Sequence, residues 1–238
     1  MTTTPVAPRP ATWREVFAVG QFRVLFGSYT LFLIGETVRM LALSVTVYAA
    51  TGSSLWSALA YAAGFLPYAL GGTLLLAFAD RWPPRTVLIG YEVLRAVVSA
   101  VLAAGLLPAP AMLALVFVTG VPSAVASASR TALLPDLLDA DRYVLGRAVF
   151  SMAAGGTQVL GFAAGGMLIA AVGAPGTLWI TAATCLASAG LLHLGLADHP
   201  RRRTGASPGI SETWQVNRAL LRRPRCGRCC WHSGSLRR

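Results

Sequence analysis

Three long stretches of this chain contain no Asp, Glu, Lys or Arg: residues 40–79, 96–129 and 148–197. A membrane-spanning helix needs about 20 apolar residues, so each stretch can hold two helices or most of two. Turn-forming residues interrupt each stretch near its middle, at 51–54, 108–110 and 173–176. The sequence therefore predicts an all-α membrane protein of six transmembrane helices, arranged as three helical hairpins.

The predicted helices fall near 24–50, 55–79, 86–107, 110–130, 148–172 and 176–197. This division leaves a cytoplasmic N-terminal segment, 1–23, before the bundle and a basic cytoplasmic tail, 198–238, after it. After about residue 225 the tail reads like out-of-frame translation of GC-rich coding sequence instead of a seventh span. We therefore expect the chain to be truncated or frameshifted there.

The charged residues are few, and their positions favour a membrane over a nucleic acid. They make up 12% of the chain, where soluble proteins have roughly 25%. The net charge of +11 comes from 20 arginines, and all but two of them lie in the gaps between apolar runs and in the tail, not on one face of a domain. The three hairpin turns carry none of them. The positive-inside rule then predicts a multi-pass protein of the inner (plasma) membrane with both termini cytoplasmic, and no nucleic-acid partner.

Two pairs of opposite charges fall inside predicted spans, each at a spacing of three that brings its members to one helical face. Glu36 and Arg39 form the first pair, and Glu92 and Arg95 form the second. We expect Glu36, near mid-span, to face a cavity and to serve transport. For Glu92 and Arg95 we expect a structural pair that reaches the cytoplasmic surface, because an unpaired charge in hydrocarbon costs several kcal/mol.

A glycine-rich segment lies in the fifth predicted helix. Gly161 and Gly165 have the GxxxG spacing that lets two helices approach closely, and Gly166 follows directly. Gln158 in the same segment lines a cavity or bonds a neighbouring helix, and the sequence leaves both readings open. A Gly-Gly pair at 71–72 matches the pair at 165–166, which favours a repeat of two three-helix units.

The segment from Leu66 to Arg85 resembles the motif that joins the second and third helices in the major facilitator superfamily. Other stretches are similar to its drug-antiporter branch, which includes macrolide efflux and enterobactin export proteins: Gly35-Glu36, Thr51-Gly52-Ser53 and Arg130 to Asp136. The resemblance implies the N-terminal half of that fold, with a 3+3 helix repeat. The chain departs from the family pattern at Pro83, where a glycine is usual, and at Phe162, where a proline is usual.

The resemblance also implies roles for individual residues. A cytoplasmic charge motif would contain Asp80, Arg81, Arg85, Glu92, Arg95 and Arg130. Proton or substrate coupling would fall to Glu36, with Arg39 and Gln158 beside it. Packing of the fifth helix would fall to Gly161, Gly165 and Gly166.

The expected function is that of a permease that couples proton movement to efflux of small amphipathic compounds such as drugs or siderophores. Its partners would be the bilayer, the substrate, protons, and either a missing C-terminal half or a second copy of the chain. As a truncated half it would be inactive, and the alternatives are a non-transporting membrane fragment, a structural six-helix bundle or a half-transporter that works as a homodimer.

No enzyme, cofactor or metal site is predicted, because the sequence has no nucleophile elbow, no phosphate-binding loop and no separated ligand pairs. The cramped cluster of Cys226, Cys229, Cys230 and His232 lacks the spacing of a zinc finger.

Overall fold

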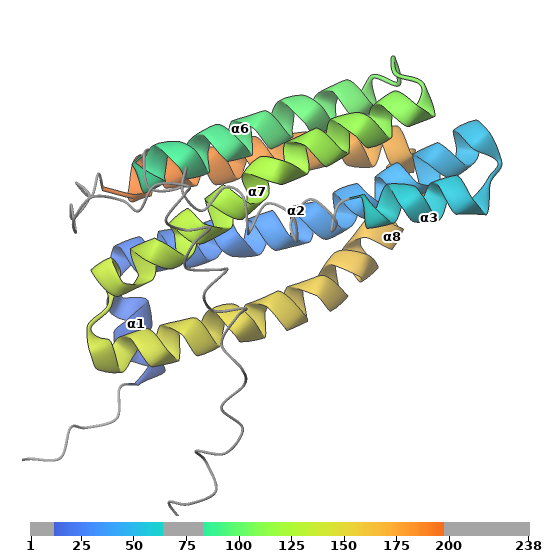
Figure 1. Cartoon of the computed structure of the whole chain (residues 1–238). Helices are drawn as coiled ribbons and strands as arrows, with labels where there is room; N and C mark the ends of the chain where they lie inside the picture. Colours follow the sequence, from blue (N-terminus) through green and yellow to red (C-terminus); the bar gives the residue numbers. More distant parts are fainter. Residues whose placement is uncertain (1–11, 64–82, 198–238) are drawn as a thin grey trace, which may run out of the picture. The chain divides into compact units, whose positions relative to one another are not determined.

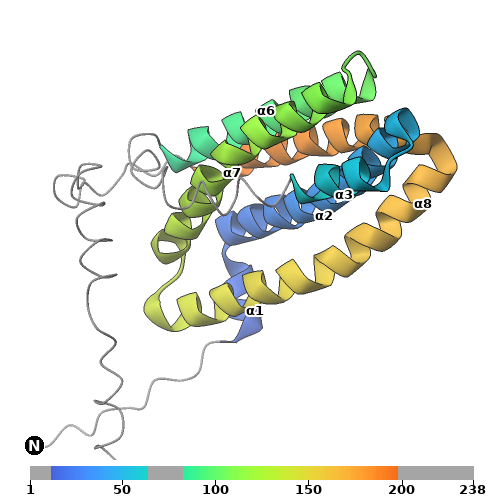
Figure 2. The same cartoon turned by 45° about the vertical axis from the view of Figure 1, so that its right-hand side comes forward.

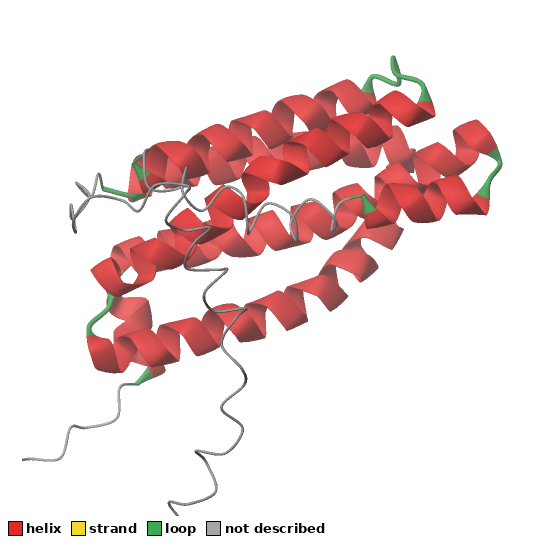
Figure 3. Cartoon of the chain, in the orientation of Figure 1, coloured by secondary structure: helices red, strands yellow, loops and turns green. Residues whose placement is uncertain are grey.

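The computed structural model describes residues 12–63 and 83–197, and all the regular elements in these two ranges are helices (Figures 1 and 3). They are α1 (Trp13–Ala18), α2 (Gly20–Thr51), α3 (Ser54–Ala62), α6 (Pro84–Ala103), α7 (Ala109–Leu137) and α8 (Ala140–Gly195). The predicted all-α class is therefore confirmed. The glycine pair at 71–72, Asp80, Arg81 and the cysteine-rich tail lie outside the described residues.

Within the described residues, four helical segments are long and apolar enough to cross a membrane, namely α2, α6, α7 and residues 142–195 of α8. The 56 residues of α8 would extend about 80 Å as one straight helix, far more than the roughly 30 Å of a hydrocarbon core. The helix bends instead at Gly173, whose φ of 75° and ψ of 172° are not helical. Figure 2 shows that α8 reverses its direction at a bend, so that its second arm runs back along the bundle, which matches the predicted fifth and sixth helices.

The helix ends differ from the predicted ones mainly around the connection between α7 and α8. We predicted that the fourth helix would end at Arg130, but α7 continues to Leu137, and α8 begins at Ala140 instead of 148. The prediction allows about 20 apolar residues for the span, which ends it near Arg130. The helix continues past this arginine because the Arg130 side chain, only 4% exposed, is covered by protein and does not face lipid.

The packing of the helices places two apolar clusters on either side of a charged layer. α2 contacts α3, α7 and α8, and α6 contacts both α7 and α8. One cluster includes Leu43 of α2, and the other includes Leu25 of the same helix. Glu36 lies between them along α2, just as Glu92 and Arg95 lie between Leu88 and Val98 along α6. The charged side chains are thus enclosed by protein.

The first arm of α8 approaches α2 closely at two glycines. A Cβ atom placed on Gly161 would lie 2.9 Å from the Cβ of Thr37, and one on Gly165 would lie 3.5 Å from the backbone Cα of Val38. The GxxxG spacing therefore lies at this helix crossing. Gly166 does not share this role, because a Cβ there would meet no described atom within 4 Å.

Replacing Gly161 by valine is expected to destabilise the bundle by about 1–3 kcal/mol, the usual cost of overpacking a close contact. The matched control is Gly166→Val, which has the same change in helix propensity but open space around the new side chain. Thermal unfolding of both variants in detergent measures the difference. Equal midpoints for the two variants would show that the glycine contact with α2 is not tight.

Candidate functional site

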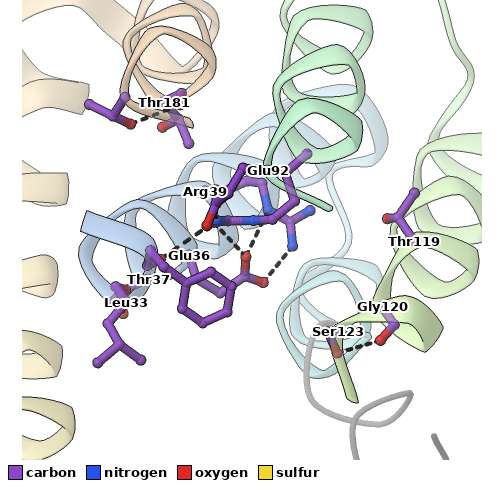
Figure 4. Close-up of polar contacts among 12 residues, drawn as sticks. Leu33, Glu36, Thr37, Arg39, Glu92, Thr119, Gly120, Ser123 and Thr181 are labelled. Carbon is purple, nitrogen blue, oxygen red and sulfur yellow. Dashed lines mark hydrogen bonds and ion pairs between the residues drawn. The ribbon is translucent and has the colours of Figure 1, made fainter. Parts of the chain in front are cut away.

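Five charged side chains from three helices gather inside the bundle, and Figure 4 shows part of this cluster. They are Glu36 and Arg39 of α2, Glu92 and Arg95 of α6, and Arg130 of α7. Each Glu-Arg pair shares one helical face because its members are three residues apart. Four of the five side chains are 6% exposed or less, whereas Glu36 is 18% exposed. Glu36 is therefore the member of the cluster that is most open to its surroundings.

Arg95 joins the two carboxylates across the helices. Its Nη1 donates to Glu92 Oε2 at 2.9 Å, and its Nη2 donates to Glu36 Oε2 at 3.0 Å. Arg39 occupies the other oxygen of Glu36, with Nη2 at 2.5 Å from Oε1. Both oxygens of Glu36 are thus bound by guanidinium groups from two helices, which makes this carboxylate a link between α2 and α6.

Arg130 approaches the same cluster from α7. Its Nη2 lies 3.7 Å from Glu92 Oε1, which is an ion-pair distance but too long for a hydrogen bond. Its guanidinium carbon lies 4.8 Å from the centre of the Phe32 ring and 5.1 Å from that of Tyr29. Arg95 also lies against the Phe32 ring, at 4.4 Å. Aromatic faces attract both cations and replace part of their lost hydration.

The expectation that Glu92 and Arg95 reach the cytoplasmic surface is wrong. Their side chains are 0% and 3% exposed, because a partner on another helix holds Arg95 inside the bundle. The pairing of Arg95 with Glu36 spans 59 positions, so no local spacing could reveal it. The available signal is the repetition of the same Glu-x-x-Arg pattern in two helices, which allows each pair to neutralise itself or the other pair.

The other predicted site residues lie elsewhere or outside the described ranges. Gln158 is exposed on the first arm of α8, and no hydrogen bond joins it to the described residues. Arg85 donates from Nη2 to the backbone carbonyl of His193 at 2.6 Å, which ties the start of α6 to the end of α8. Asp80 and Arg81 are outside the described residues, so the structure describes four members of the predicted charge motif, namely Arg85, Glu92, Arg95 and Arg130.

The cluster carries more positive than negative charge. With every group ionised, three arginines against two glutamates leave a net charge of +1. Within residues 12–63 and 83–197, no group of three or more His, Cys, Asp or Glu residues could hold a metal ion. With three arginines and two glutamates, the cluster can exchange ion-pair partners, bind a proton on a carboxylate or attract an anion.

The comparisons with known proteins agree with this architecture. A family model described as Major Facilitator Superfamily matches residues 25–234, and a search of the curated proteins found no match. The family match covers most of the chain, including all three helices that supply the charged cluster. The chain thus belongs to the Major Facilitator Superfamily of membrane transporters.

Proposed function

We propose that this chain forms one half of a proton-coupled exporter of small amphipathic compounds such as drugs or siderophores. The observation that carries the proposal is the buried cluster of five charges contributed by α2, α6 and α7. Ionisable side chains inside membrane helices are costly and commonly mark substrate or ion pathways. Export and antiport are inferred from the resemblance of the motifs to the drug-antiporter branch.

Glu36 is the proposed proton carrier, with Arg39 as its partner on α2. In the observed conformation both of its oxygens accept hydrogen bonds from arginines, so a proton can enter only where a guanidinium group withdraws. Withdrawal of Arg95 would also loosen the contact between α2 and α6. Proton binding is thereby linked to a change in helix packing, which a coupled transporter requires.

Two further roles are proposed for residues outside this cluster. Asp80 and Arg81 would form a cytoplasmic charge motif with Arg85, whose contact with His193 lies where α6 begins and α8 ends. Gln158 would offer a polar contact to substrate, because it is an exposed polar side chain in the charge-free part of that arm.

The transport cycle of this fold rocks two six-helix halves about a site between them. The first arm of α8 bears large apolar side chains that the described residues leave uncovered, including Met152 at 65% and Val159 at 70% exposure. Lipid or another half would cover such a surface. We propose that a second six-helix half, or a second copy of this chain, completes the transport site, and that one half alone does not transport. A purely structural bundle is the competing reading.

Both termini are proposed to be cytoplasmic, in the inner (plasma) membrane. Single cysteines at Ser53, Pro108 and Asp139, in a chain whose native cysteines are changed to serine, test this orientation. A membrane-impermeant maleimide should label the first two from outside the cell and spare the third. Labelling of the Asp139 position from outside would reverse the topology.

Dye efflux from energised vesicles tests the function itself. Vesicles holding the chain alone are compared with vesicles in which it is joined to a second six-helix half, using a neutral, a cationic and an anionic dye. We expect movement of at least one dye by the joined form, driven by an imposed pH gradient and stopped by a protonophore. Absence of gradient-driven movement in both forms would reject the proposal, and movement by the chain alone would favour the homodimer.

A further inference from the structure

Among the described residues, Arg130 is the arginine of the cluster with the longest contact to a carboxylate. Arg39 and Arg95 make all the short contacts to the two carboxylates, at 2.5–3.3 Å. The contact of Arg130 with Glu92 is longer, at 3.7 Å. Arg130 of α7 is therefore the most weakly paired of the three arginines.

The guanidinium group of Arg130 also has unused hydrogen-bond donors. Its Nε and Nη2 atoms are buried and find no acceptor among the described residues, although the side chain is only 4% exposed. Leaving charged hydrogen-bond donors buried without an acceptor is costly, and an arginine donor pair matches the geometry of a carboxylate or similar anion. An anion that approached Arg130 would satisfy both donors at once.

The surroundings of Arg130 are aromatic. Tyr29 and Phe32 lie against its guanidinium group, and the Tyr29 ring stacks on Phe150 of α8 at 4.7 Å between centroids. Phe26 joins the same group of rings, 5.7 Å from Phe150. A ligand with a flat apolar body and one anionic group would match both the charge and the aromatic side chains.

We propose that Arg130 binds the anionic group of an amphipathic organic anion, and that such anions are the substrate class of this transporter. The inference rests on the proposed export function, since it names the substrate of the same site. Arg130 thereby receives a binding role in place of the cytoplasmic motif suggested by the sequence. Tyr29 and Phe32 hold the guanidinium group in position and contact the apolar body of the ligand.

Equilibrium binding to the full 238-residue chain in detergent tests this inference without requiring transport. Three probes share a naphthalene body and differ in charge: 1-naphthylacetate, 1-naphthaleneethanol and 1-naphthylethylamine. We expect the anion to bind about tenfold or more tightly than the neutral alcohol, since a charge-assisted hydrogen bond contributes that much. The amine should bind most weakly, because the cluster has a net positive charge.

Substitutions at Arg130 test whether this residue causes the tighter binding of the anionic probe. Arg130→Gln should remove the advantage of the anion over the alcohol, while Arg130→Lys should retain part of it. Arg142→Gln is the matched control, because Arg142 is 38% exposed and its carboxylate contacts are 3.8 and 3.9 Å long. Equal binding of the three probes by the unchanged chain would overturn the inference even if a variant failed to fold. It would leave gradient-driven dye efflux, and so the proposed function, intact.

Two further experiments distinguish an organic anion from an inorganic anion and from a lipid headgroup as the group that Arg130 binds. Sulfate that displaces 1-naphthylacetate at equal concentration would show that the aromatic rings add nothing, which overturns the organic substrate. The probe's binding is also compared in phosphatidylglycerol and phosphatidylcholine nanodiscs. Binding that is lost in phosphatidylglycerol but complete in phosphatidylcholine would show that Arg130 binds a lipid headgroup, which also overturns the organic substrate. Retained binding in both lipids, with weak competition by sulfate, supports the proposal.

Discussion

Replacing Arg95 by leucine is expected to destabilise the protein by about 3–5 kcal/mol, which is the usual result of removing one member of a buried ion pair. Arg95 donates to Glu92 at 2.9 Å and to Glu36 at 3.0 Å, so its loss would leave two carboxylates short of their shared partner. Glu92 is the more affected of the two, because its side chain is fully buried. Thermal unfolding in detergent should show a midpoint lowered by roughly 6–20 °C.

Two comparisons show whether the effect comes from the unpaired carboxylates. Arg142→Leu removes the same charge from a side chain that is 38% exposed, and should change stability by less than about 0.5 kcal/mol. The double variant Arg95→Leu/Glu92→Leu should recover part of the lost stability, since it removes the buried carboxylate together with its partner. No recovery in the double variant, or an unshifted midpoint in Arg95→Leu, would contradict the proposed bridging role.

The helices of this fold are predictable from the sequence because their signal is local. Runs without charge and central turn formers place the helical hairpins, and the bend of α8 at Gly173 falls within the predicted turn at 173–176. The repeat of two three-helix units is not tested, because the glycine pair at 71–72 lies outside the described residues. The local signal thus specifies where the described helices turn more readily than how they pack.

The charged cluster is less predictable because it depends on contacts between helices. Sequence spacing pairs Glu36 with Arg39, and the structure contains that contact. The sequence spacing does not reveal that Arg95 donates to Glu36. It also does not reveal that Arg130 lies against two aromatic rings instead of marking a helix end. Both features arise from the packing of α2, α6 and α7, where a neighbouring helix offsets the cost that the prediction assigned to a charge in lipid.

Glu36→Gln is expected to reduce gradient-driven efflux at least about tenfold in the chain joined to a second six-helix half, and to remove its dependence on the pH gradient. Glutamine retains the size of the side chain but cannot carry the coupling proton. It also weakens the hydrogen bonds from Arg39 and Arg95, which are strong because the acceptor is a carboxylate. Efflux along a substrate gradient, measured without a pH gradient, should remain and shows that the variant is folded.

Glu92 and Glu15 supply the matched comparisons for that loss of coupling. Glu92→Gln changes a carboxylate of the same cluster that is 0% exposed, so it should affect stability more than the pH dependence of efflux. Glu15→Gln changes a carboxylate that is 50% exposed and whose Arg142 contact is 3.8 Å long, and it should leave both unchanged. If Glu92→Gln removes the pH dependence while Glu36→Gln retains it, the coupling proton binds on α6 and Glu36 serves only to hold α2 against Arg95.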